Sequence, residues 1–337
     1  MVRTMHKWLL SVAVLLAGVH VSVAQTLDPL NGLQPAPSPL NSASQLHTSR
    51  PANTFDYRTP EDRNDSVLVG NPALDGPRYN LGWFATVDLD FLGSHVHNKL
   101  SNTVAVGPNA DQVALPSTKL SWTVAPRFEA GYRFGQATGE FLVSYRFLST
   151  SGSTTTPAFD AAGNTGLLRS RLAMNVIDFD YASQEPSLAP WFEMKWRFGI
   201  RLANLYFDSA EASPLLQQHE TNYFFGAGPH AAVELWRPVA DSRFGLFCKL
   251  DAAGVLGKVQ QGFEETLPGP VSGFTRQSQF MPTVMLNIQA GIGWTPRDNW
   301  RITCGYTYEH WWDAAFAAGS TGDVWTQGVF LRSEWKY

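Results

Sequence analysis

Long runs of alternating apolar and polar residues constrain the fold of this chain more than any other feature. In the clearest run, residues 192–202, every second side chain is apolar and four of the five between them are charged. A period of two places one set of side chains on each face of a strand. The run is about twice the ~5–6 residues of an ordinary strand and suits a tilted strand of ~9–11 residues crossing a bilayer.

Similar runs recur along the chain and predict ten strands, an even number as bacterial single-chain barrels require. They lie near residues 79–92, 119–134, 139–149, 167–181, 190–207, 219–236, 243–256, 279–295, 299–311 and 324–337. The alternation changes phase once, and we expect a bulge near residues 175–177. The predicted fold is an all-β, transmembrane, antiparallel up-and-down β-barrel of about ten strands, with eight or twelve also possible.

The N-terminal sequence is typical of a signal peptide for secretion. Arg3 and Lys7 precede an apolar run over residues 8–19, and Ser22-Val23-Ala24 has the small-x-small pattern of a cleavage site, so we expect a signal peptide over 1–24. A membrane anchor is the alternative. Residues 25–75 are rich in Pro and Ser and predict a flexible periplasmic extension before a barrel domain over 76–337.

Composition agrees with a membrane barrel. No stretch of 18 apolar residues follows the signal, so a membrane protein of this sequence must be a closed barrel. Charged residues make up 16%, against about 25% in soluble proteins. The net charge of -4 and the scattered basic residues argue against a nucleic-acid partner. With only Cys248 and Cys304, no disulfide framework is possible.

The links between the predicted strands alternate in length. The longer ones are 93–118, 150–166, 208–218, 257–278 and 312–323, and the shorter ones are 135–138, 182–189, 237–242 and 296–298. Long outer loops and tight periplasmic turns are typical of outer-membrane barrels. This parity predicts both barrel ends of the chain on the periplasmic side, in the cell outer membrane.

Aromatic residues cluster at the ends of the predicted strands, where two belts at headgroup level are expected. The expected membrane-interface aromatics are Trp83, Trp122, Trp191, Trp236, Trp294, Trp300, Trp311, Trp312, Trp335 and Tyr337. A final strand ending in an aromatic residue is also typical of a signal for the barrel-assembly machinery. Lipid of the outer membrane and this machinery are therefore expected partners; the oligomeric state is not fixed by the sequence.

Several segments resemble the major outer membrane protein family of Legionella and its pore-forming relatives. They include residues 223–229 (YFFGAGP), 253–257 (AGVLG), 197–201 (RFGIR), 176–181 (VIDFDY) and 305–312 (GYTYEHWW), in family order over roughly 79–337. The resemblance implies an outer-membrane barrel that conducts small solutes.

The polar faces of the strands carry charges of both signs, and we expect them to line the lumen. The expected lumen-lining residues are Asp88, Asp90, Arg127, Glu129, Arg133, Arg146, Arg169, Arg171, Glu193, Lys195, Arg197, Arg201, Lys249, Asp251, Arg301 and Glu309. Rings of charged side chains around a water-filled lumen select solutes by their charge. We therefore expect a narrow pore for small solutes or ions. About eight strands leave room only for side chains, so a closed structural or adhesive barrel acting through long outer loops is the alternative.

An outer-membrane hydrolase is a weaker alternative. Asp88 and Asp90, with histidines or acids at other outer strand ends, would supply an acid–base set. Those further residues are His95, His97, Asp208, His219 and His310. No nucleophile-elbow motif accompanies them. We expect no enzyme activity, no metal and no cofactor.

Overall fold

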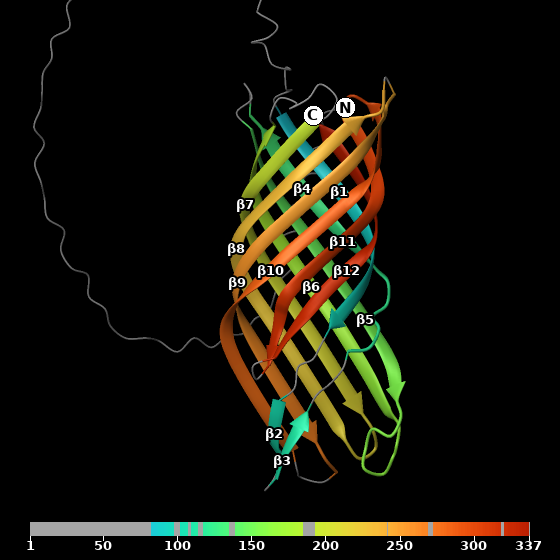
Figure 1. Ribbon diagram of the computed structural model, residues 1–337, viewed down its shortest axis with the longest axis vertical. Coiled ribbons are helices and arrows are strands. Elements are labelled where there is room, and N and C mark those ends of the chain that lie inside the picture. The colour runs from blue at the N-terminus through green and yellow to red at the C-terminus, as the bar shows by residue number, and fades with distance from the viewer. Residues whose placement is uncertain are drawn as a thin grey trace, which may run out of the picture. The chain divides into compact units, whose positions relative to one another are not determined.

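The computed structural model describes residues 82–97, 102–106, 109–113, 117–134, 139–184, 193–240, 242–268, 272–317 and 320–336. Within them, ten strands form one closed antiparallel barrel (Figure 1). This confirms the predicted fold. No helix in this part of the chain is long and apolar enough to cross a membrane. The predicted signal peptide and Pro-rich extension lie outside the described residues.

Each barrel strand pairs with its neighbours in chain order. The barrel strands are β1 (Gly82–His97), β4 (Thr123–Arg133), β5 (Glu140–Thr156), β6 (Gly166–Gln184), β7 (Glu193–Ala212), β8 (Gln217–Pro238), β9 (Phe244–Thr266), β10 (Ser272–Arg297), β11 (Trp300–Ala317) and β12 (Ser320–Lys336). The short hairpin of β2 (Asn102–Val106) and β3 (Asn109–Val113) lies in the link from β1 to β4. The last strand closes on the first, from Phe84 opposite Lys336 to His97 opposite Asp323.

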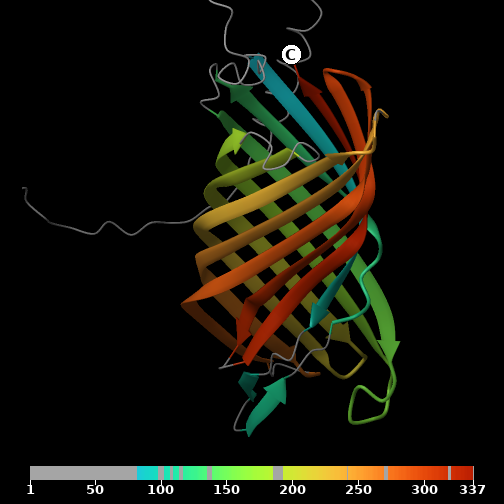
Figure 2. The same ribbon diagram turned by 45° about the horizontal axis from the view of Figure 1, so that its top comes forward.

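The barrel has two distinct ends (Figures 1 and 2). We call the end where β1 starts and β12 finishes the terminal end, and the opposite one the distal end. The strands cross the barrel obliquely, as closure requires. The hairpin of β2 and β3 lies at the distal end.

The strands extend further at the distal end than the sequence predicted. The expected loops 257–278, 208–218 and 312–323 shrink to 267–271, 213–216 and 318–319 because the strands on both sides continue. The predicted alternation of long and short links is therefore wrong in its lengths. In these distal extensions the regular alternation is lost, because polar residues occur on both faces, as in Gln260-Gln261. Alternation of hydropathy marks the part of a strand that meets lipid, whereas backbone pairing continues past it.

The predicted bulge near residues 175–177 is also wrong. The register of β6 against β5 runs without a shift through Phe147–Asn175, Arg146–Val176 and Tyr145–Ile177. Leu172, Met174 and Val176 point into the barrel and are buried. The phase change in the sequence therefore reflects a change from a polar to an apolar interior, with no break in the backbone.

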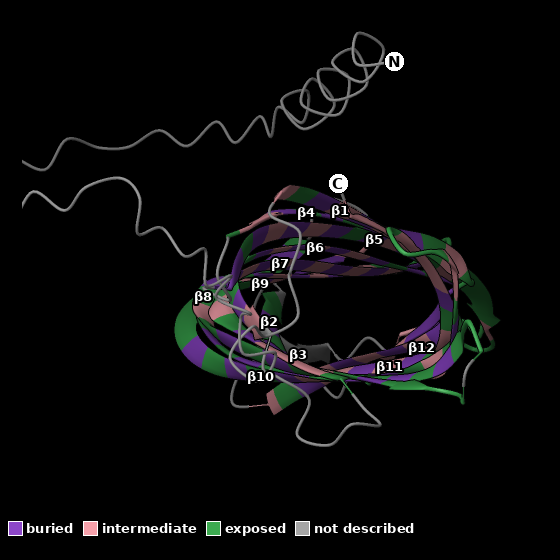
Figure 3. Cartoon of the chain, turned by 90° about the horizontal axis from the view of Figure 1, so that it is seen from above, coloured by how far each residue is buried: buried purple, intermediate pink, exposed green. Residues whose placement is uncertain are grey.

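Burial alternates along every barrel strand (Figure 3). The outward residues between the strand ends are apolar and exposed, among them Leu250, Ile200 and Leu331. Cys248 and Cys304 are free and exposed. The outer wall is apolar, and each barrel strand is paired on both sides. Both features are typical of a transmembrane barrel.

A charge in the middle of this outer wall is expected to destabilise the barrel. Leu250 is 48% exposed, six residues from the terminal end of β9. Leu250→Arg should lower the free energy of unfolding by about 2–4 kcal/mol, because the guanidinium would sit near the bilayer midplane. Gln260→Arg, on the same face near the distal edge of the apolar wall, should cost only about 0–1 kcal/mol. Urea unfolding of protein folded into lipid vesicles measures both; equal costs would place the membrane elsewhere.

Candidate functional site: the barrel interior

Ion pairs join opposite walls of the barrel. Arg146 on β5 binds both carboxylate oxygens of Glu309 on β11, although β4, β1 and β12 separate the two strands along the wall. Arg197 on β7 lies 2.5 Å from Glu129 on β4 and 2.9 Å from Glu234 on β8. The pairs of Arg146 with Glu309 and of Arg197 with Glu129 cross the lumen and are buried, so side chains from strands that are not neighbours meet inside the barrel.

A second group of charges surrounds Arg201 on β7, which is completely buried. Its Nε lies 2.6 Å from Asp178 on β6, and its Nη2 lies 3.2 Å from Asp251 on β9. His230 on β8 joins the same group, with Nδ1 2.7 Å from Asp180 and Nε2 2.9 Å from Asp251. Acids and bases from four adjacent strands thus compensate one another, as buried charges must.

The group also contains ligand types that metals use. One ligand atom each from Asp178, Asp180 and His230 lies within 4.8 Å of the others. However, both nitrogens of His230 face carboxylates, and the imidazole can donate to both only in its charged form. A neutral ring is needed to ligate a metal. The geometry therefore favours a hydrogen-bonded charge cluster over a metal centre.

Arg332 on β12 connects the remaining acids of this layer. It donates to both oxygens of Asp88 on β1, at 2.8 and 3.0 Å, and to Gln289 on β10 at 3.1 Å. Glu234 lies 3.6 Å away, and Lys249 reaches the same Glu234 at 3.4 Å. Through Glu234, Arg332 and Lys249 also connect to Arg197 and Glu129, so this group of buried charges reaches from β12 to β4.

Aromatic rings and a further acid cover this network towards the terminal end. Arg133 and Lys195 both bind Glu140, and the Lys195 ammonium lies 5.2 Å from the centre of the Phe84 ring. Arg301 lies 4.1 Å from the centre of the Trp236 ring. Cations over aromatic faces are attracted by the ring quadrupole, so these rings hold the cations in place while filling space.

Towards the distal end the interior changes to an apolar layer. The layer includes Leu172, Met174, Phe224, Met285 and Trp311, each 1% exposed or less. Trp311 donates its indole N–H to Glu309 at 2.6 Å, which ties the two layers together.

Beyond the apolar layer the interior is polar again, with buried Glu211, Glu220 and Glu265. The link from β1 to β4 covers this part. Asn102 of β2 donates to inward-facing Gln261 at 3.3 Å, and Thr275 of β10 donates to the Thr103 carbonyl at 3.1 Å. Chain from the first distal link therefore packs against the distal opening.

The structure places most of the expected lumen residues on the inner face. These are Asp88, Asp90, Arg127, Glu129, Arg133, Arg146, Lys195, Arg197, Arg201, Lys249, Asp251, Arg301 and Glu309. Glu193 lies at the terminal mouth, with a side chain 52% exposed and 3.6 Å from Arg301.

Arg169 and Arg171 were assigned to the wrong face. Their neighbour Ser170 points inwards and bonds to Ser209, so both arginines point outwards and are exposed. The apolar interior residues of β6 misled the assignment, because Leu172 and Met174 were taken as the lipid face. Sequence reasoning also missed Arg332, Asp178, Asp180 and His230. These residues lie on the polar face of alternating strands, and this pattern in the sequence could have identified them.

Two of the expected interface aromatics also lie inside. Trp236 and Trp311 are buried in the lumen, contrary to the belt assignment. Trp236 occupies space that glycines leave open: a Cβ on Gly245 or Gly293 would come within 2.2 or 2.5 Å of its ring.

The other belt residues vary in exposure. Trp83, Trp122, Trp294 and Trp312 are exposed, and Trp300 and Trp335 are half-buried. Trp191 and Tyr337 lie outside the described residues.

The acid–base set considered from the sequence is not assembled. Asp88 and Asp90 are buried in the interior. His95 and His310 stack on Trp325 and Trp312, with ring centres 4.0 and 4.3 Å apart. His97 is exposed at the distal end of β1, and Asp208 and His219 pair on the outer wall.

The distal loop between β5 and β6 is organised by Asp160. Burial opposes its ionisation, but hydrogen bonds from Asn164, Ser213 and the Ala162 amide outweigh this and lower the pKa of Asp160 to about 2. Ser213 belongs to the next distal link, so one carboxylate joins two loops. Asp160 thereby cross-links the β5–β6 and β7–β8 links.

Removing this carboxylate should loosen both loops. Because the pKa is lower in the folded chain, the stabilisation is present above pH ~4 and fades as the pH falls towards 2. Asp160→Asn should therefore speed amide hydrogen exchange in residues 157–165 at neutral pH, while exchange in the barrel strands stays unchanged. The ratio of variant to wild-type rates should fall as the pH approaches 2. A ratio of one at neutral pH would contradict this role of Asp160.

Breaking a cross-lumen ion pair should cost far more than breaking one at the mouth. Glu309→Gln leaves Arg146 buried and without its carboxylate, which costs about 3–5 kcal/mol. Glu193→Gln is the same chemical change at an exposed pair and should cost about 0–1 kcal/mol. Urea unfolding in vesicles reports both. Similar small costs would mean that water reaches Glu309.

No family model and no curated protein matches the chain, so the resemblance to the Legionella family stays a prediction. Several solved structures are similar in architecture. OmpT, the outer membrane protease from Escherichia coli, is 8% identical and covers 77% of this chain and 99% of its own, with a TM-score of 0.48. The Pseudomonas putida toluene transporter TodX is 9% identical and covers 80% of this chain and 94% of its own, with a TM-score of 0.33.

Neisserial surface protein A is 12% identical and covers 77% of this chain and all of its own, with a TM-score of 0.23. One of these proteins is a protease, one a transporter and one a surface protein. Barrels of related architecture host different activities.

Proposed function

We propose that this chain is a closed barrel of the bacterial outer membrane that acts through its distal hairpins at the cell surface. The apolar outer wall and the closed sheet support a place in a membrane, and the secretion signal expected at the N-terminus supports the outer one. The distal end would then face the exterior, and the terminal end the periplasm.

The closed state rests on one observation, which is that side chains from opposite walls meet across the interior. Arg146 with Glu309 and Arg197 with Glu129 are such pairs, and all four side chains are 9% exposed or less. A lumen wide enough for water would leave them exposed. The apolar layer beyond them adds a second obstacle to ions.

The distal hairpins support a role in binding. Strands β8, β9 and β10 have 22, 23 and 26 residues, whereas a strand needs only ~9–11 to span the bilayer. Backbone pairing continues to the tip, from Ser272 opposite Thr266. Such hairpins present a pre-organised surface, and binding to a rigid surface loses less conformational entropy.

A narrow pore is the second candidate, favoured by the density of charges of both signs in the interior. It requires the cross-lumen pairs to separate, so that water enters between the walls. In that case the arginine and glutamate side chains released from these pairs would line the pore and set its ion selectivity.

Conductance in planar bilayers tests the proposal. Wild-type protein should insert without steady channel steps, because the walls stay joined. The triple variant Arg146→Ala, Arg197→Ala and Glu309→Ala removes side chains that cross the lumen and should show measurable steps. A variant of equal size on the outer wall, Leu250→Ala with Ile200→Ala and Leu331→Ala, is the control and should remain silent.

Steady conductance of the wild type would overturn the closed barrel. The pore would then be supported if Arg197→Glu with Arg201→Glu shifted the reversal potential towards cation selectivity.

A further inference from the structure

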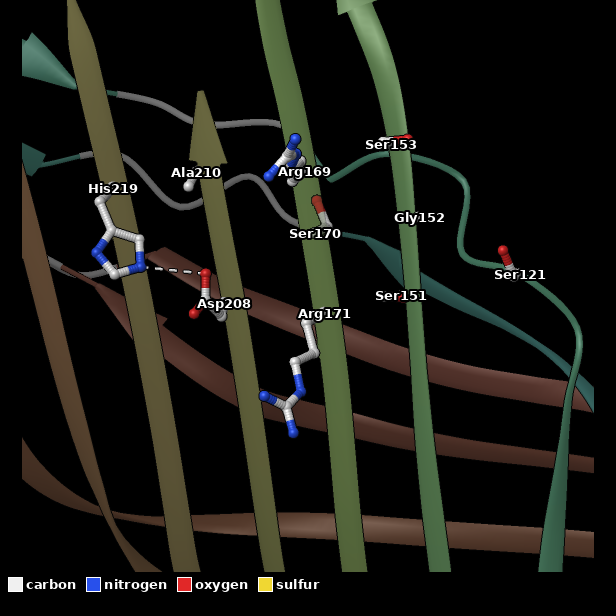
Figure 4. A pocket seen from close by; sticks show the side chains of 10 residues that line it. All are labelled: Ser121, Ser151, Gly152, Ser153, Arg169, Ser170, Arg171, Asp208, Ala210 and His219. Atoms are coloured by element: carbon white, nitrogen blue, oxygen red, sulfur yellow. Dashed lines mark hydrogen bonds and ion pairs between the residues drawn. The ribbon is translucent and has the colours of Figure 1, made fainter. Parts of the chain in front are cut away.

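A depression lies on the outer wall near the distal end, across β5, β6, β7 and β8 (Figure 4). Its volume is about 570 Å³. Arg169 and Arg171 on β6 lie in its middle, between Ser151 and Ser153 on β5 and Asp208 on β7. It belongs to the outward face of the barrel and is separate from the buried charges of the interior.

The depression begins directly beyond two paired tyrosines on the outer wall. Tyr206 on β7 faces Tyr223 on β8 and Ala173 on β6 across the strand pairs. One pleat further towards the distal end, Arg171 is opposite Asp208, and one pleat beyond that Arg169 is opposite Ala210. Tyrosines of barrels mark the level of lipid headgroups. With a rise of about 7 Å per pleat, both arginines lie at that level or just above it.

Both guanidinium groups are available to a ligand. Within the described part of the chain, neither Arg169 nor Arg171 has an ion pair or a hydrogen bond, and both are exposed. The one acid in the depression, Asp208, is already engaged by His219 at 3.1 Å and by the Tyr206 hydroxyl at 3.0 Å. Glu264 on β9 lies opposite His219, on the side away from the arginines.

His219 lies beside Asp208 on this wall. Its hydrogen bond with Asp208 outweighs the effect of burial and raises the pKa of His219 above its usual value. The same bond, opposed by burial, lowers the pKa of Asp208. Hydrogen bonds with His219 and Tyr206 thus engage Asp208, whose carboxylate also attracts Arg171 electrostatically. The two arginines outnumber the one acid in the depression.

We propose that this depression is a phosphate-binding site that takes the phosphorylated headgroup of a lipid in the adjacent leaflet. Two guanidinium groups two residues apart on one strand face present planar forks of donors, which match phosphate oxygens. The hydroxyls of Ser151 and Ser153 add neutral donors beside them. A lipid is the fitting source because the site opens sideways, immediately above the apolar wall where acyl chains would lie.

Native mass spectrometry of the full chain in neutral detergent micelles tests the site. The probes are phosphatidic acid, phosphatidylcholine and inorganic phosphate, each added separately. Wild-type protein should retain phosphatidic acid, and Arg169→Gln with Arg171→Gln should weaken this retention at least about tenfold, because both charge-assisted contacts to the phosphate are lost. The control is Lys258→Gln with Arg276→Gln, which removes two exposed cations from β9 and β10 and should bind as the wild type does.

The outcomes separate the sources of phosphate. Loss of phosphatidic acid in the arginine variant alone, with inorganic phosphate unable to compete, supports a lipid headgroup. Equal competition by inorganic phosphate at similar concentration supports a site for phosphate itself and overturns the lipid assignment. Equal retention by the arginine variant, the control and the wild type overturns the site. Binding of phosphatidylcholine that equals that of phosphatidic acid and is unchanged in the arginine variant overturns it as well.

Discussion

Closure of the sheet is the constraint on which the rest of this structure depends. In a bilayer the backbone finds no water, so each strand must pair on both sides, and β12 must return to β1. The register of that last pair runs from Phe84 to His97 without a gap. Once ten strands close, the interior has a fixed width, and this width limits which side chains can fill it.

The filling of that width explains the layered interior. A barrel of about eight strands is filled by ordinary side chains, and two more strands leave a gap that long side chains can span. Arginine, glutamate and tryptophan have the reach, which accounts for Arg146, Arg197, Glu309 and Trp236. Buried ions are costly unless paired, and Arg146 and Arg197 each join a carboxylate on another strand. This layer of long side chains therefore keeps opposite walls of the barrel at a fixed distance. Apolar side chains of the same length would have the same mechanical effect.

The sequence predicted the barrel, the strand number and most inward-facing residues, because the outer wall must be apolar along every strand. It failed where the interior is apolar too. On β6, Leu172 and Met174 face inwards, so hydropathy no longer distinguishes the faces, and Arg169 and Arg171 were assigned to the wrong side. Trp236 and Trp311 were misplaced for the same reason. The partners of each charge could not be predicted, because they come from strands far apart in the chain, as with Arg332 and Asp88.

The length of the distal strands sets where contact with other molecules takes place. The 26 residues of β10 span roughly 90 Å along the strand, and at a tilt near 45° they rise about 60 Å. The apolar band of such barrels is about 25 Å tall. The tips therefore lie some 30 Å above the hydrocarbon layer of the membrane. A molecule that binds the tips therefore makes its contacts well above the headgroups, in water, including contacts with Phe274, which is 78% exposed near the tip of β10.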